Sequence, residues 1–233
     1  MLSKSTAGWM LGAALTVLAS GASAQTISNA GFENPAPPSG GFTLYGPGDT
    51  IGGFTAFGPS GSNVAVISTT FRDFAGTNNA HSGGAFLDLT GSQDNGLSQG
   101  VVQSVATVAG QAYTLSFFIG HQRFDGNPTI VGVSTTGALG TFTTFTNGDT
   151  SGTDGASIVY KAFSLNFTAT SASTSIAFRN DQPRSIRSAA LDDISIAPFA
   201  AAVPGPIAGA GIPALLGLAG LTLARRRRSG VPA

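Results

Sequence analysis

The chain has 233 residues, with 11 Lys and Arg, 11 Asp and Glu, and no Cys. The zero net charge hides an uneven distribution, because the segment from Gln25 to Val203 holds six basic against eleven acidic residues, a net charge of −5. An acidic body lacks the basic surface that nucleic-acid binding requires, so we expect no nucleic-acid partner. Without cysteine, a disulfide framework and a thiol nucleophile are excluded, and the core alone must hold the fold.

The first 24 residues have the three parts of a secretory signal peptide. Lys4 supplies a positive start, an apolar run from Trp9 to Ala19 follows, and Ala22-Ser23-Ala24 forms an Ala-x-Ala exit. The apolar run is too short to cross a bilayer, which takes about 20 residues. We therefore predict a helical signal peptide over residues 1–24, cleaved after Ala24. The alternative is an uncleaved N-terminal membrane anchor.

Residues 200–233 have a layout typical of a C-terminal membrane segment. Val203-Pro204-Gly205-Pro206 is followed by an uncharged stretch from Ile207 to Ala224 and then by Arg225-Arg226-Arg227-Arg228. A helix over that stretch would rise about 27 Å, close to the hydrocarbon thickness of a bilayer. The positive-inside rule keeps the arginines in the cytoplasm and the body outside. We predict a single transmembrane helix here.

This tail resembles the PEP-CTERM sorting signal of Gram-negative bacteria, in which a Pro-containing motif, one transmembrane helix and a basic cluster end the chain. Gly205 stands where that family usually carries an acidic residue, so the match is a variant. The resemblance implies an exosortase-like transpeptidase as partner, transient contact with the inner membrane, and export to the cell surface or the medium from a membrane-anchored precursor. The sequence leaves open whether the tail is cleaved or stays as an anchor.

The body, residues 25–199, is rich in strand and turn residues and poor in helix formers. Short β-type runs alternate with turn signals such as Asn95-Gly96 and Ala109-Gly110. The expected strands are Gly41–Leu44, Phe54–Phe57, Val64–Ile67, Ala85–Thr90, Gly100–Val108, Ala112–His121, Ile130–Thr135, Thr141–Thr146, Ser157–Ala169, Thr174–Asn180 and Ala189–Pro198. Regular short strands without a helical period predict an all-β fold, an antiparallel β-sandwich.

Alternation with a period of two assigns faces to three of these strands, which we expect to be core strands solvated on one side. The residues expected to face the core are Tyr113, Leu115, Phe117 and Ile119, then Phe163, Leu165 and Phe167, then Ile176 and Phe178.

Five segments, in this order, resemble the galactose-binding-like jelly roll of carbohydrate-binding modules and of secreted bacterial and plant cell-wall proteins. They are the opening motif Asn29–Pro35, then Ala85–Gly91, Val108–Phe117, Phe167–Ser171, and the closing motif Ala190–Ile196. The resemblance covers nearly the whole body and implies a jelly-roll sandwich.

Asp192 is the residue that most needs a partner. Counting by twos from Ile196 through Ile194 places it on an apolar face, where a carboxylate is costly unless it meets a cation or several donors. In jelly rolls of the kind resembled, the Glu of the opening motif and this Asp often hold structural calcium. That implies Glu33 and Asp192 as Ca²⁺ ligands, completed by backbone carbonyls. The alternative is an Asp bonded to backbone amides at a sheet corner.

The sequence has no pattern typical of a catalyst, so we expect a protein that is not an enzyme. His81 and His121 are the only histidines, and neither has metal-type spacing. A nucleophile elbow or a Gly-rich phosphate loop between a strand and a helix is missing as well. We interpret His81 as a solvated loop histidine, and Asp149 and Asp154 as turn residues.

A sugar site is not located by the sequence. The only Trp, Trp9, leaves with the signal peptide. A loop-end site would use Phe118, His121, Arg123 and Phe124 with Asp125 and Asn127, and a packed loop is the alternative. We expect an exported, non-catalytic cell-surface or matrix protein associated with extracellular polysaccharide. The alternative is a carbohydrate-binding module with a defined glycan ligand.

Overall fold

The computed structural model describes residues 25–73, 76–92, 98–122, 128–149, 151, 157–182 and 188–199. The predicted signal peptide, the sorting motif, the transmembrane helix and the arginine cluster lie outside these ranges. Within the described ranges, no apolar helix of membrane-spanning length occurs.

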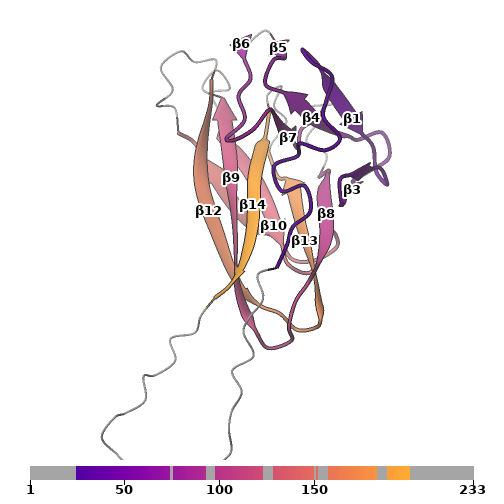
Figure 1. Cartoon of the computed structure of the whole chain (residues 1–233), viewed down its shortest axis with the longest axis vertical. Coiled ribbons are helices and arrows are strands. Elements are labelled where there is room, and N and C mark those ends of the chain that lie inside the picture. Colours follow the sequence, from indigo (N-terminus) through magenta and orange to yellow (C-terminus); the bar gives the residue numbers. More distant parts are fainter. Residues whose placement is uncertain are drawn as a thin grey trace, which may run out of the picture. The chain divides into compact units, whose positions relative to one another are not determined.

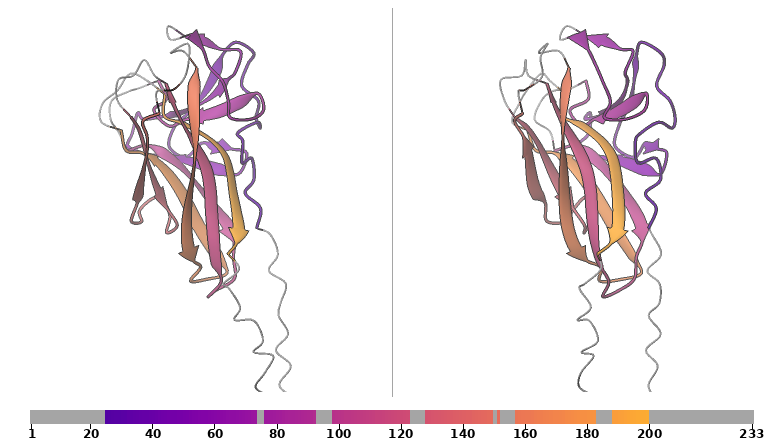
Figure 2. Two further views of the ribbon diagram at one scale, coloured as in Figure 1. Left: turned by 90° about the vertical axis from the view of Figure 1, so that its left-hand side faces the viewer. Right: turned by 60° about the vertical axis from the view of Figure 1, so that its left-hand side comes forward.

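The described residues form two six-stranded sheets that face each other as two layers (Figures 1 and 2). Sheet A runs in the order β1 (Phe42–Tyr45), β4 (Val64–Ser68), β7 (Ala85–Asp88), β14 (Ala190–Pro198), β9 (Ala112–Gln122) and β12 (Ile158–Thr168). Sheet B runs in the order β11 (Thr143–Asn147), β10 (Thr129–Ser134), β13 (Ser173–Asn180), β8 (Gly100–Ala106), β3 (Phe54–Phe57) and β2 (Thr50–Ile51). All pairings within these sheets are antiparallel, so the predicted all-β sandwich is confirmed.

Every predicted strand is present, with bounds that differ from the expected ones by at most two residues. The strands that the sequence did not reveal are β2, β5 (Arg72–Asp73) and β6 (Gly76–Thr77), which have two residues each. Two residues are too few to show the alternation on which the prediction rests.

The core lies between the sheets, and the predicted inward faces supply it. Tyr113, Leu115, Phe117 and Ile119 of β9 are all at most 1 % exposed. The predicted residues of β12, such as Phe163, are only partly buried, because β12 lies at one edge of sheet A. Fully burying one such side chain contributes about 1.5–3 kcal/mol. The aromatic rings therefore supply much of the stability that a chain without disulfides needs.

Strand β14 contains a bulge that corrects one prediction about Asp192. The register shifts between Asp192 and Ser195, and Asp193 has a φ of 47°, an uncommon conformation for a non-glycine residue. Asp192 pairs with Phe118, which belongs to the outward residues of β9. The count by twos from Ile196 was therefore wrong about the face, because it assumed an unbroken strand. Asp192 is nevertheless 0 % exposed.

A small second core on the outer face of sheet A explains that burial. Ala65, Ile67, Phe86, Ile158 and Ala190 form a buried apolar cluster there, separate from the main core. Side chains of the connection between β4 and β7 pack against this cluster, among them Phe71 and Ala80. The connection thus covers part of the outer face of sheet A.

Candidate functional site

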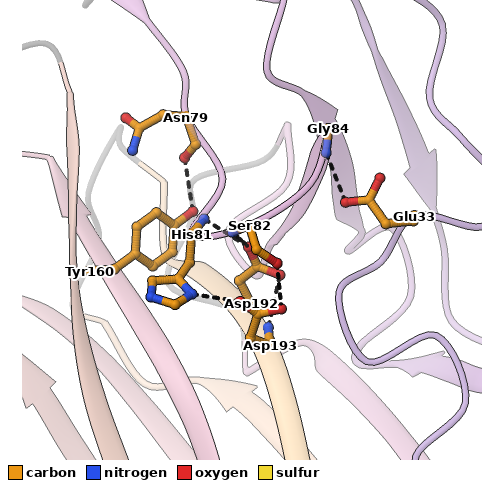
Figure 3. Close-up of polar contacts among 8 residues, drawn as sticks. All are labelled: Glu33, Asn79, His81, Ser82, Gly84, Tyr160, Asp192 and Asp193. Atoms are coloured by element: carbon orange, nitrogen blue, oxygen red, sulfur yellow. Dashed lines mark hydrogen bonds and ion pairs between the residues drawn. The ribbon is translucent and has the colours of Figure 1, made fainter.

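The end of the β4–β7 connection is tied to strand β14 by carboxylates (Figure 3). The backbone N–H groups of His81 and Ser82 donate to Asp192 Oδ2 at 2.8 and 3.2 Å. The N–H of Asp193 donates to Asp192 Oδ1 at 2.8 Å. The bulge makes this arrangement, because it turns Asp192 outward under the covering segment. Backbone donors therefore surround the buried carboxylate, in agreement with the alternative of an Asp bonded to backbone amides.

Asp193 holds the side chains of the same segment. His81 Nδ1 lies 2.5 Å from Asp193 Oδ2, and Ser82 Oγ donates to Asp193 Oδ1 at 2.8 Å. The imidazole of His81 stacks on the ring of Phe118 with a centroid separation of 3.5 Å. His81 is an exposed loop residue, as the sequence indicated, with its side chain 34 % exposed; the stack on Phe118 and the contact with Asp193 also hold its ring in place.

Glu33 fastens the far end of the covering segment. The neighbouring Phe32 is 0 % exposed and packs against Phe54, which fixes the backbone of the opening motif. Glu33 Oε1 accepts hydrogen bonds from the N–H groups of Gly84 and Ala85 at 3.0 and 3.2 Å. Figure 3 shows Glu33 apart from the two aspartates, at the Gly84 end of the segment. We call Glu33, His81, Ser82, Asp192 and Asp193 the Asp192 cluster.

Burial controls the electrostatics of this cluster. The pKa of Asp192 is raised from 3.8 to about 6, mainly by burial and also by the charge of Asp193, while the donating amides oppose the rise. Burial, followed by the nearby aspartates, also raises the pKa of Tyr160 well above 10. The Tyr160 hydroxyl donates to the Asn79 carbonyl at 3.0 Å. Because Asp192 is fully covered, its carboxyl group is out of reach of a substrate and acts within the fold.

The predicted calcium ligands meet only part of what the ion needs. Asp192 Oδ2 and Glu33 Oε1 each accept two N–H groups, which occupies both lone pairs of each oxygen. Asp192 Oδ1 and Glu33 Oε2 retain acceptor capacity toward the described residues. Both side chains lie near Gly31, where an added Cβ would stand 3.5 Å from Asp192 Oδ1 and 4.0 Å from Glu33 Cγ. Among the described residues no group of three His, Cys, Asp or Glu is placed to hold a metal. Any cation here would therefore depend on backbone carbonyls as well.

Of the residues suggested for a loop-end sugar site, Phe118 and His121 lie within the described ranges, so that site stays a prediction. Phe118 belongs to the outward residues of β9, whereas His121 is 2 % exposed and lies 3.2 Å from Thr129 Oγ1 through its Nδ1. Arg123, Phe124, Asp125 and Asn127 lie outside the described residues. Asp149 is a turn residue as expected, since its Oδ1 accepts the N–H of Ser151. Asp154 lies outside the described residues.

The outer face of sheet B carries a different arrangement, a cross-strand row over five strands. The register aligns Phe57 with Gly100, Gly100 with Arg179, Arg179 with Gly132, and Gly132 with Thr144. Directly opposed residues share a face of a sheet. We call these five residues the Arg179 row. Phe57 and Arg179 are half-buried, and Thr144 is exposed.

Arg179 is fixed at the centre of the row by two neighbours. Its Nε and Nη2 donate to Asp181 Oδ1 and Oδ2 at 2.5 and 3.1 Å, a bidentate ion pair. Its guanidinium carbon lies 3.8 Å from the centroid of the Phe142 ring, in the geometry of a cation–π contact. The glycines make room for this packing. A Cβ on Gly100 would stand 2.8 Å from Phe57 Cζ, and a Cβ on Gly132 would stand 2.9 Å from Asp181 Cγ.

The sequence carries one signal for this row. The inward assignment of Ile176 and Phe178 already implies that Arg179 faces outward. The alignment of Phe57, Gly100, Gly132 and Thr144 with Arg179 depends on the pairing of strands distant in sequence, which alternation within one strand does not reveal.

The comparisons with known proteins agree with the fold. No protein-family model and no curated protein matches the chain. Among solved structures, a cyclase from Fischerella sp. TAU, in complex with 4-(1H-indol-3-yl)butan-2-one, is 20% identical with a TM-score of 0.52; the match covers 76% of this chain and 98% of the cyclase. A β-1,4-galactotriose complex of TmCBM61 is 16% identical with a TM-score of 0.44, covering 76% of this chain and 100% of that one. The K3 adhesin domain of Lys-gingipain from Porphyromonas gingivalis is 18% identical with a TM-score of 0.45, covering 74% and 97%. At such identities, the similarity to the cyclase concerns the fold.

Proposed function

We propose that this chain is an exported, non-catalytic protein of the cell surface or matrix, and that it binds extracellular polysaccharide through the outer face of sheet B. The Arg179 row is the observation that carries the proposal. Together with the adjoining Phe142, it combines two half-buried aromatic rings, a guanidinium held in one orientation and an exposed hydroxyl. Ligand sites typically pair apolar and aromatic surface with a few oriented polar groups.

The chemistry of the row suits a sugar. The C–H faces of a pyranose ring are apolar and pack against aromatic rings such as Phe57 and Phe142. Sugar hydroxyls accept from the N–H groups of Arg179 that Asp181 leaves unused, and they exchange hydrogen bonds with the Thr144 hydroxyl. Because the ion pair already fixes Arg179, binding costs little side-chain entropy there.

Export is the second part of the proposal, and it rests on the two ends of the chain. The signal peptide at residues 1–24, with its exit at Ala22 and Ala24, directs secretion. The Val203–Pro206 motif and the basic cluster Arg225–Arg228 support handling by an exosortase-like transpeptidase at the inner membrane. Delivery to the surface would bring the body into contact with extracellular polysaccharide.

A structural calcium ion is a separate proposal. We propose that Glu33 and Asp192 contribute to it through Oε2 and Oδ1, beside Gly31. A bound Ca²⁺ would supply positive charge to the buried carboxylate of Asp192. The protein's own amides at residues 81–85 hold the remaining two oxygens and orient both side chains.

The binding proposal is tested with the purified full chain against a panel of neutral and acidic polysaccharides. We expect micromolar binding to at least one polymer, and a loss of about tenfold on Phe57→Ala or Phe142→Ala because the ring contacts disappear. Phe42→Ala is the matched control, since Phe42 is 40% exposed on sheet A. The proposal would be refuted if no polysaccharide of the panel binds, or if all three variants lose affinity equally.

A further inference from the structure

We propose that Asp181 makes the Arg179 row selective for neutral over acidic glycans. The inference rests on the proposed function, since it names the class of polysaccharide that the same face takes. It treats Asp181 as a residue that determines specificity by controlling the charge that Arg179 presents, rather than as a direct sugar contact.

The geometry of the ion pair determines how much positive charge Arg179 presents to a ligand. Both oxygens of Asp181 accept from Arg179, at 2.5 and 3.1 Å, so the two planar groups face each other in a fork. The Arg179 side chain is 29% exposed and the Asp181 side chain 15% exposed. A guanidinium paired in this way offers directed N–H donors but little net positive charge to an approaching ligand.

The fold holds Asp181 in that position. Its backbone N–H donates to the Ile130 carbonyl at 3.1 Å, which continues the pairing of β13 with β10. Its carboxylate lies over Gly132, where any side chain would meet Asp181 Cγ at 2.9 Å. A glycine opposite Arg179 therefore admits the carboxylate against the sheet, and the pair is built into the strand register.

The negative net charge of the body also disfavours acidic polymers. Of the described basic residues Arg72, Lys161 and Arg179, the last is the one on this row, and the segment from Gln25 to Val203 has a net charge of −5. A polymer of uronic acids would approach a negatively charged body with no uncompensated described cation at the row. Like charges lower both the association rate and the affinity, and more so at low ionic strength. A neutral polymer meets no such penalty.

The experiment compares each acidic polysaccharide with its carboxyl-reduced form, which has the same backbone but carries primary alcohols in place of carboxylates. Polygalacturonate, alginate and hyaluronan are the probes, tested with the full chain alongside neutral glucans, xylans and galactans. At 50 mM NaCl we expect wild-type binding to a recognised reduced polymer to exceed that to its native form by about tenfold. Binding to neutral polymers should be unchanged at 500 mM NaCl.

Asp181→Asn retains size and an acceptor oxygen but removes the charge. We expect it to gain about tenfold in affinity for native acidic polymers, with a new salt dependence, while neutral binding persists. Asp181→Glu keeps the charge and should keep the neutral preference. Asp49→Asn removes the same charge outside the row and should gain less than twofold. Melting curves confirm that each variant is folded.

The outcomes separate the two proposals. Wild-type preference for native acidic polymers, or an Asp181→Asn variant without the gain, would overturn the selectivity and leave polysaccharide binding in place. Binding to none of the native, reduced or neutral polymers would overturn the proposed function, and the selectivity with it.

Discussion

The two outer faces of the sandwich both carry aspartates, but these aspartates have different surroundings. On the outer face of sheet A, the carboxylates of Asp192 and Asp193 accept hydrogen bonds from His81 and Ser82, and Asp192 is 0% exposed. On sheet B, Asp181 is paired with Arg179 on a half-buried row beside aromatic rings. Each site also relies on a glycine that lets a carboxylate approach the backbone, Gly83 for Glu33 and Gly132 for Asp181.

The difference shows that coverage by another segment determines whether a polar cluster can contact a ligand or acts only within the fold. Once a segment covers a carboxylate, that group stabilises the fold and is unavailable to a ligand. An ion pair that stays partly exposed on its strand row keeps donors for an incoming partner. We therefore propose a structural role for the Asp192 cluster and a binding role for the Arg179 row.

Substituting Asp192 gives the largest expected loss of stability. Asp192→Ala leaves three backbone N–H groups under the covering segment without their acceptor. We expect the free energy of unfolding to fall by about 3 kcal/mol and the melting temperature by roughly 10 °C. Ser195→Ala, at an exposed position of the same strand, is the control and should change stability by less than about 0.5 kcal/mol. A loss no larger than that of the control would contradict the structural role.

Calcium should sharpen the comparison, because we propose a Ca²⁺ site at the Asp192 cluster and none at the Arg179 row. With the ion at about 100 times its dissociation constant, binding adds about 2.7 kcal/mol to the free energy of unfolding, which raises the melting temperature by several degrees. Glu33→Gln should reduce that rise. Identical melting in calcium and in chelator would instead leave the amide donors as the whole explanation of the buried carboxylates.

Stability should also depend on pH through Asp192 when calcium is chelated. Its folded-state pKa of about 6 lies above the ordinary value of 3.8, so the folded protein holds this proton more tightly than the unfolded chain does. The resulting stabilisation is complete below about pH 4 and is lost as the pH rises through about 6. Subtracting the profile of Asp192→Asn from that of the wild type isolates the effect. A difference that stays flat between pH 4 and 6 would show that Asp192 is already ionised at low pH.

Comparing Gly83→Ala with Gly40→Ala isolates the energetic cost of the contact with the Glu33 carboxylate. Gly83 and Gly40 have the same φ of 69°, but an added Cβ meets the Glu33 carboxylate at Gly83 and nothing within 4 Å at Gly40. Alanine at either site carries the cost of a left-handed backbone, about 1 kcal/mol. We expect Gly83→Ala to cost about 1 kcal/mol more than Gly40→Ala in chemical denaturation. Equal costs would mean that Glu33 moves away freely.

The sequence predicts the strands well because each carries its own signal. The alternation of Tyr113, Leu115, Phe117 and Ile119 is local, and their burial follows from it. The face of Asp192 was not predictable by the same reasoning, because a bulge at Asp193 breaks the alternation without a glycine to mark it. The stack of His81 on Phe118 and the row around Arg179 depend on contacts between distant segments, which a single sequence does not encode locally.

Hydrogen exchange with and without a bound neutral polysaccharide tests the central claim, that ligands meet sheet B and not the Asp192 cluster. We predict slower exchange in β3, β8, β10 and β13 around the Arg179 row, with residues 79–85 unchanged. Protection confined to residues 79–85 and β14, with the row unaffected, would contradict the account and move the binding site to the outer face of sheet A.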